Sequence, residues 1–172
     1  MRYDIREQLG RHDAEITLDI DAPAPPGTDV EFVGSVTGRI TLRNLGRELA
    51  AWGHLRAVAL MPCARCVTEH EVPLDFDFSE TVGLAQIDEP LSYTQVADDD
   101  VPSPIPILDG GTVDLSELVR QLLVLHTPVR SVCRPDCRGL CPECGADLNE
   151  TTCDCGREEI DPRLAPLRKL LQ

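Results

Sequence analysis

Eight cysteines are the residues of this sequence whose type and spacing could do chemistry. Six of them fall within residues 133–155, and the other two form the pair Cys63 and Cys66. The piece CPECG at 141–145 has the form of a zinc knuckle, in which two thiolates converge on one ion and glycine permits the required backbone turn. The spacing therefore predicts a bound metal, with zinc as the ion.

A second pair of thiolates must complete the tetrahedron, and the CxC pair at 153–155 is the nearest. The first predicted site is Cys141, Cys144, Cys153 and Cys155. In one interpretation the remaining cysteines form a second site, made of Cys63, Cys66, Cys133 and Cys137. In the other, the protein holds one zinc only and these four stay free or partly buried. Either way the zinc is structural, because the C-terminal segment has little apolar core of its own.

Two catalytic uses of the thiols compete with this interpretation. A redox CxxC should open a helix after a strand, where the helix terminus lowers a thiol pKa, but the pair at 63–66 lies between two predicted strands. A catalytic zinc keeps an open position, usually with histidine or carboxylate ligands. The four histidines lie outside the cysteine cluster, at His12, His54, His70 and His126. The sequence therefore predicts a protein that is not an enzyme and has no small-molecule substrate.

Three arginines surround the first cysteines of the cluster at intervals of four, at Arg130, Arg134 and Arg138. Arginines on the rigid turns of a zinc module can contact phosphate groups, so these three are candidates for binding RNA or another partner. The structural alternative is that they offset the negative charge of a four-thiolate zinc site.

Strands are expected to position the first cysteine pair. Residues 70–78 alternate strictly between apolar and polar side chains, and residues 16–20, 36–42 and 49–61 also read as strands. Trp52, Val58 and Leu60 are the core candidates of the stretch 49–61, and Gly38 indicates a bulge or a close backbone approach. Residues 1–82 are therefore predicted to form an antiparallel β-sheet meander, with barrel-like closure as an alternative to an open sheet.

The rest of the chain divides into three parts. Residues 83–113 read as an acidic loop rich in proline and glycine. Residues 114–128 are predicted to form one amphipathic helix, with Asp114 as N-cap and Glu117 in a capping box. Its apolar positions are Leu115, Leu118, Val119, Leu122 and Leu125. Residues 129–172 form the Cys-rich zinc-binding module, with a short terminal helix that starts near Asp161. The predicted class is α+β.

Charge and composition limit the partners. The 172 residues carry a net charge of −14, and residues 63–110 contain eleven acidic side chains and one basic side chain. Such an acidic chain is better suited to bind a basic partner, such as a ribosomal protein, than to form a broad phosphate-binding surface. No apolar run is long enough to span a membrane, and residues 1–10 lack the apolar core of a secretion signal. The expected location is the cytoplasm, where cysteines bind metal more often than they form disulfides.

Several pieces of the chain resemble the YceD-like family of bacteria and plastids, called large ribosomal RNA subunit accumulation proteins. They are CARC at 63–66, VDL at 113–115, CRGLCPECGADLN at 137–149, CDC at 153–155 and IDPRLAPL at 160–167. The resemblance covers the chain from residue 111 onward and is looser before residue 50. Two departures are Val67, where the family often has leucine, and the less apolar helix end LHTP at 125–128.

The resemblance implies a role in making or accumulating large-subunit ribosomal RNA, and it carries over no catalytic residues. The expected partner is the large-subunit ribosomal RNA precursor or a basic ribosomal protein. Two other hypotheses remain at this stage: a zinc-ribbon adaptor linked to transcription, and a metal-dependent RNA-processing enzyme.

Overall fold

The computed structural model describes residues 1–9, 11–46, 48–86, 105–108 and 111–155. The chain divides into two compact units. The first unit comprises Met1–Met61 and His70–Ser131, and the second comprises Pro62–Glu69 and Val132–Gln172. All eight cysteines belong to the second unit.

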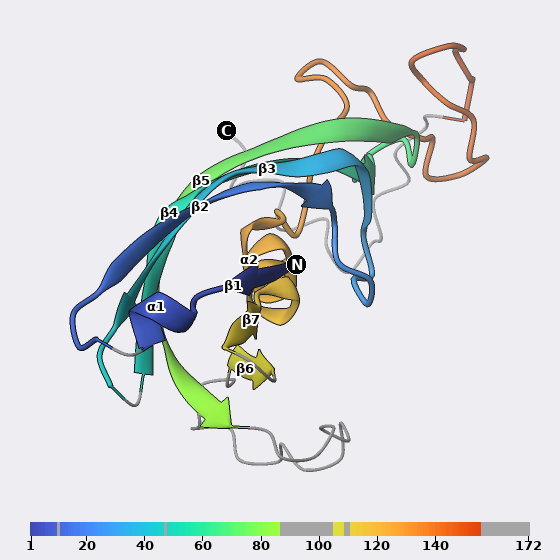
Figure 1. Ribbon diagram of the computed structural model, residues 1–172. Helices are drawn as coiled ribbons and strands as arrows, with labels where there is room; N and C mark the ends of the chain where they lie inside the picture. Colours follow the sequence, from blue (N-terminus) through green and yellow to red (C-terminus); the bar gives the residue numbers. More distant parts are fainter. Residues whose placement is uncertain (10, 47, 87–104, 109–110, 156–172) are drawn as a thin grey trace, which may run out of the picture. The chain divides into compact units, whose positions relative to one another are not determined.

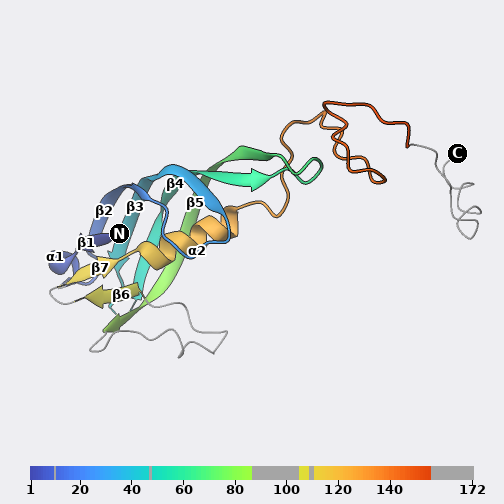
Figure 2. The same cartoon turned by 90° about the vertical axis from the view of Figure 1, so that its right-hand side faces the viewer.

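Seven strands form one sheet (Figure 1). They are β1 (Arg2–Asp4), β2 (Glu15–Pro23), β3 (Glu31–Asn44), β4 (Glu48–Pro62), β5 (Glu69–Gln86), β6 (Ile105–Leu108) and β7 (Thr112–Asp114). Their order is β1-β7-β6-β5-β4-β3-β2, which Figure 2 shows from the side. The pairs β1–β7, β2–β3, β3–β4 and β6–β7 are antiparallel, and β5–β6 is parallel. Among the described residues β1 and β2 are the two edges, so the sheet is open and barrel-like closure is not observed.

Helix α2 (Ser116–His126) lies on the concave side of the sheet, while α1 (Arg6–Leu9) is a single turn (Figure 1). Four predicted apolar positions of α2 are buried in the core: Leu115, Leu118, Val119 and Leu122. The prediction for Leu125 is wrong, because this side chain is 72% exposed. The buried residues of α2 instead end with Leu122 and Leu123, and the half-buried ring of His126 stacks on Phe76 at a centroid distance of 3.8 Å. The predicted α+β class with one amphipathic helix is confirmed.

The start of α2 differs from the predicted capping box. Asp114 Oδ1 accepts the amide N–H of Ser116 at 3.0 Å, and the cap position itself is Leu115. Glu117 does not reach back toward the cap, because Arg120 Nε donates to its carboxylate at 2.8 Å. This guanidinium holds the pKa of Glu117 below its ordinary value.

The core-facing side of β5 was predicted correctly from the alternation of its side chains, whereas that of β4 was not. On β5, Leu74 and Phe78 are buried while Asp75 and Asp77 are exposed, as predicted. On β4 the prediction is wrong, because Trp52, Val58 and Leu60 lie on the more exposed face. The core side of β4 carries Leu49, Ala51, Leu55, Ala57, Ala59 and Met61. Alternation of side chains along a strand shows that the two faces differ, but not which face lies in the core. On β4 the core face carries several alanines, so its apolar character was weak in the sequence.

The predicted loop 83–113 contains strands at both ends. Strand β5 runs to Gln86, and β6 begins at Ile105 and is followed by β7. Residues 87–104 and the predicted terminal helix near Asp161 lie outside the described residues. Within the described ranges, neither helix has the length and apolar character needed to cross a membrane.

Candidate metal centre

The first cysteine group joins two distant segments within the second unit. Cys63 and Cys66 lie on the connection between β4 and β5, and Cys133 and Cys137 follow α2. The four Sγ atoms all lie within 4.8 Å of one another. Cys63 Sγ is 3.8 Å from Cys137 Sγ, and Cys66 Sγ is 3.7 Å from Cys133 Sγ. The group thus brings together thiols that are 74 and 67 residues apart in the sequence.

The backbone around Cys63 folds into a tight turn that aims amide groups inward. The amide of Val67 donates to the carbonyl of Cys63 at 2.9 Å, and the amide of Cys63 donates to the carbonyl of Thr68 at 2.9 Å. The amide of Arg65 points at Cys63 Sγ, 3.4 Å away. Val67 closes the turn with a φ of 64°, a left-handed conformation that is unusual for a β-branched residue.

The second group, Cys141, Cys144, Cys153 and Cys155, repeats this turn. The amide of Gly145 donates to the carbonyl of Cys141 at 2.9 Å, and the amide of Cys141 donates to the carbonyl of Ala146 at 2.8 Å. Gly145 has a φ of 72°, so it matches Val67 in both position and conformation. The four Sγ atoms again lie within 4.8 Å of one another, but Cys144 and Cys155 are exposed.

Asn149 and Arg65 make contacts that hold the segments of this unit together. Asn149 Nδ2 lies 3.5 Å from Cys137 Sγ, and Asn149 Oδ1 accepts the amide N–H of Arg138 at 2.9 Å. The Arg65 guanidinium donates to the carbonyl of Cys137 at 2.8 Å. A Cβ at Gly139 would approach the Arg65 carbonyl oxygen to 2.9 Å, so this close contact requires glycine. Neither Asn149 nor Arg65 was singled out from the sequence, although both lie inside the pieces that carry the family resemblance.

The pKa values of the thiols indicate that each group needs a cation to hold several thiolates at once. Amide donors, led by that of Cys133, lower the pKa of Cys63 to about 5, whereas burial and the neighbouring thiols raise the pKa of Cys133 to about 12. In the second group the amides of Cys144 and Glu143 lower the pKa of Cys141 to about 7. The side chain of Cys144 raises the pKa of Cys155 to about 12. Each group can therefore hold one thiolate readily, but further thiolates need a positive ion.

The geometry fits zinc. With Zn–S bonds of about 2.3 Å, the sulfurs of a regular tetrahedron lie about 3.8 Å apart. Two Sγ–Sγ distances of the first group, 3.8 Å between Cys63 and Cys137 and 3.7 Å between Cys66 and Cys133, match this edge. Four protein ligands would close the coordination shell, which is the arrangement of structural zinc. The four histidines belong to the first unit, so the described residues place none among the thiols of either group.

The structure divides the predicted arginine set. Arg130 is exposed in the first unit, whereas Arg134 and Arg138 are exposed in the second. Arg134 Nε lies 3.5 Å from Asp136 Oδ1. Arg134 and Arg138 lie close in sequence to the candidate ligands Cys133 and Cys137. All three exposed arginines stay candidates for a partner contact.

Replacing Val67 with glycine is expected to stabilise the metal-bound second unit by about 1 kcal/mol, because an L-residue in this conformation costs roughly 1–2 kcal/mol. Little packing is lost, since Val67 is 63% exposed. The matched change is Gly145→Ala, which meets no atom within 4 Å and so tests the backbone alone. It should weaken zinc binding, measured by competition with a chelator. Tighter zinc retention by Gly145→Ala than by the unaltered protein would contradict the equivalence of the two turns.

Comparison with known proteins relates this chain to ribosomal RNA factors. Residues 51–171 match the family model described as Large ribosomal RNA subunit accumulation protein YceD. The Arabidopsis thaliana protein "Large ribosomal RNA subunit accumulation protein YCED homolog 1, chloroplastic" is 43% identical over 58 residues, which are 34% of this chain and 18% of that protein. The chain thus spans less than a fifth of that relative.

Two bacterial relatives cover more of the chain. Uncharacterized protein Rv2926c of Mycobacterium tuberculosis is 32% identical over 180 residues, which cover 99% of this chain and 81% of that protein. Uncharacterized protein YlbN of Bacillus subtilis is 27% identical over 114 residues, covering 66% of this chain and 60% of that protein. No solved structure has significant similarity to the chain.

Proposed function

Because this chain belongs to the YceD family, whose model matches residues 51–171, we propose that it is a non-catalytic factor in the accumulation, processing or assembly of large-subunit ribosomal RNA. The proposal that the protein is not catalytic rests on the metal-binding atoms, because each candidate metal site has four cysteine sulfurs. A site with four protein ligands leaves no open position for water or substrate.

The proposed cofactor is zinc, with one ion in each cysteine group. Thiolates are soft ligands that select zinc among the common divalent ions, and a structural zinc supplies folding energy to a small module. The first group would hold the 63–66 turn against the segment that follows α2. The second would hold the CPECG turn against the CDC pair at 153–155.

The proposed partner is the large-subunit ribosomal RNA precursor or a basic ribosomal protein, met in the cytoplasm. Arg134 and Arg138 are exposed beside the first cysteine group and could reach phosphate. The net charge of −14 favours a contact with a basic protein at least as much as direct contact with RNA.

Sedimentation of a lysate that contains tagged protein tests this proposal. We expect the protein to migrate with precursors of the large subunit and not with mature ribosomes. A triple variant with Arg130→Ala, Arg134→Ala and Arg138→Ala tests direct contact with RNA. Unchanged binding of this variant to the particles would rule out a direct RNA contact through these arginines. Protein found only at the top of the gradient, or stably bound to RNA polymerase, would overturn the assembly role and favour an adaptor.

A further inference from the structure

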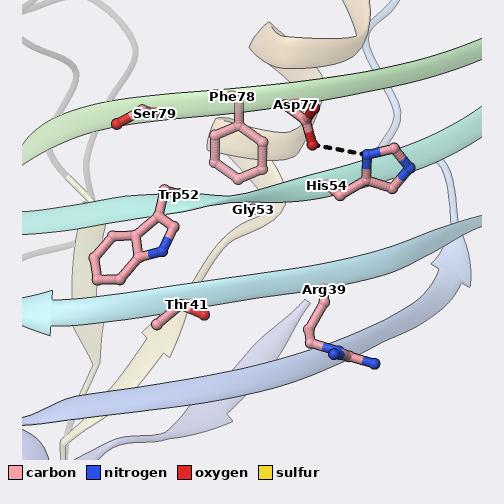
Figure 3. A pocket seen from close by; sticks show the side chains of 8 residues that line it. All are labelled: Arg39, Thr41, Trp52, Gly53, His54, Asp77, Phe78 and Ser79. Atoms are coloured by element: carbon pink, nitrogen blue, oxygen red, sulfur yellow. Dashed lines mark hydrogen bonds and ion pairs between the residues drawn. The ribbon is translucent and has the colours of Figure 1, made fainter.

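A hollow of about 490 Å³ lies on the sheet around Trp52, the single tryptophan of the chain (Figure 3). Its lining includes Arg39 and Thr41 from β3, His54 from β4, and Asp77 from β5. Trp52 is half-buried in the middle of β4 and faces Thr41 across the ladder. An aromatic ring with a polar surround is common where one protein anchors another.

The hollow belongs to the face of the sheet that α2 does not cover, here called the outer face. Residues of β2–β5 alternate, and the set that includes Ile40, Leu55 and Leu74 packs with α2 in the core. The alternate set, which includes Arg39, His54 and Asp75, therefore points the other way. The longer helix of the first unit, α2, therefore packs on the opposite face of the sheet.

Charge is distributed in rows across the outer face. Most of its acids lie on the flanking strands β2 and β5, which carry Glu15, Asp19, Asp21, Glu69, Glu71, Asp75 and Asp77, while Glu31 and Glu48 lie at the starts of β3 and β4. The central strands β3 and β4 carry Arg39, Arg43, His54 and Arg56. Carboxylates outnumber the basic side chains, so the face is negative.

The basic side chains of the central strands already have carboxylate neighbours. Arg39 Nε lies 3.3 Å from Asp19 Oδ1, Arg56 Nε lies 3.1 Å from Asp75 Oδ2, and His54 Nδ1 lies 2.9 Å from Asp77 Oδ1. A phosphate group would have to compete with these acids, which disfavours RNA. A cationic side chain could share them at little cost, because Asp19 and Asp77 are 89% exposed and exposed ion pairs contribute little stability.

We propose that the outer face binds a segment rich in lysine and arginine from a protein partner, with the ring of Trp52 at the centre and the acids of β2 and β5 on either side. The ring can hold a guanidinium, since Arg43 Cζ already lies 5.4 Å from its centroid. This inference deepens the proposed function, because it gives the basic protein partner a surface on the first unit, away from the cysteine groups in sequence.

Trp52 is also the reporter that tests the inference. The full chain is titrated with a fluorescently labelled peptide rich in lysine and arginine, with an acidic peptide of equal length, and with labelled oligouridine. We expect the basic peptide alone to change the emission of Trp52 and to gain anisotropy. A response to oligouridine without one to the basic peptide would overturn the proposal, as would no response to any probe.

Variants then separate the outer face from general charge attraction. The pair Asp19→Asn and Asp77→Asn should weaken basic-peptide binding about tenfold, the effect of about 1.4 kcal/mol. The control pair Glu7→Gln and Asp29→Asn removes equal charge away from these positions and should change affinity less than about twofold. Equal weakening by both pairs would overturn the proposal. If the Asp19 and Asp77 variant loses peptide binding yet still migrates with particle precursors, the proposed function stands and this surface is not its attachment point.

Discussion

Serine in place of Cys137 is expected to remove one of the two proposed zinc ions and to unfold much of the second unit. Cys137 is only 3% exposed, and its sulfur contacts that of Cys63 from a segment far away in sequence. Changes in groups that merely orient metal ligands cost about 10–100-fold in affinity, so loss of a ligand should exceed about 100-fold. Zinc per chain, measured by elemental analysis, and hydrogen exchange of residues 132–155 report the two effects.

The second cysteine group supplies the matched control. Cys144 is exposed, and serine there should release the other zinc while residues 63–66 keep their protection from exchange. Acid should release both ions from the unaltered protein, because zinc binds thiolates and competes with protons for them. Two zinc ions per chain in the Cys137→Ser protein would contradict the proposed ligand set.

The members of the two cysteine groups were not equally easy to predict from the sequence. The group at 141–155 is local, so the spacing of CPECG and CDC indicates its membership directly. The other group joins turns that are separated by β5, β6, β7 and α2. Spacing alone left these four thiols either as a second site or as free cysteines, because a contact between distant segments depends on the topology of the whole chain. The amide and guanidinium contacts of Asn149 and Arg65 arise from that same topology.

Trp52 illustrates how face assignment fails in the sheet. It was a core candidate because it shares one face of the predicted strand with Val58 and Leu60. The inner face of β4 is instead filled by small residues such as Ala51 and Ala57 together with leucines. On β5 the polar positions are aspartates, so the wet face was unambiguous and the prediction succeeded. On β4 both faces carry apolar residues, and the one that α2 covers is decided by packing across the unit. The residue that sequence reasoning placed in the core is thus the centre of the proposed docking face.

Alanine in place of Gly53 is expected to destabilise the first unit by roughly 3 kcal/mol or more, a large part of the stability of an ordinary domain. A Cβ at this position would lie 2.0 Å from the carbonyl oxygen of Arg39, which is backbone and cannot rotate away. Strands β3 and β4 would have to separate where Ile40 pairs with Gly53. Urea unfolding followed through the neighbouring Trp52 measures the loss.

Gly34→Ala is the control for backbone strain alone. Gly34 has a φ of 74°, yet nothing lies within 4 Å of the added Cβ, so its cost should be about 1 kcal/mol. Gly53 has the opposite character, since steric overlap and not a left-handed φ requires glycine there. If Gly53→Ala costs no more than Gly34→Ala, the close approach of β3 and β4 is not required for stability. A larger loss for Gly53→Ala would show that the close approach of β3 and β4 is required for the stability of the first unit.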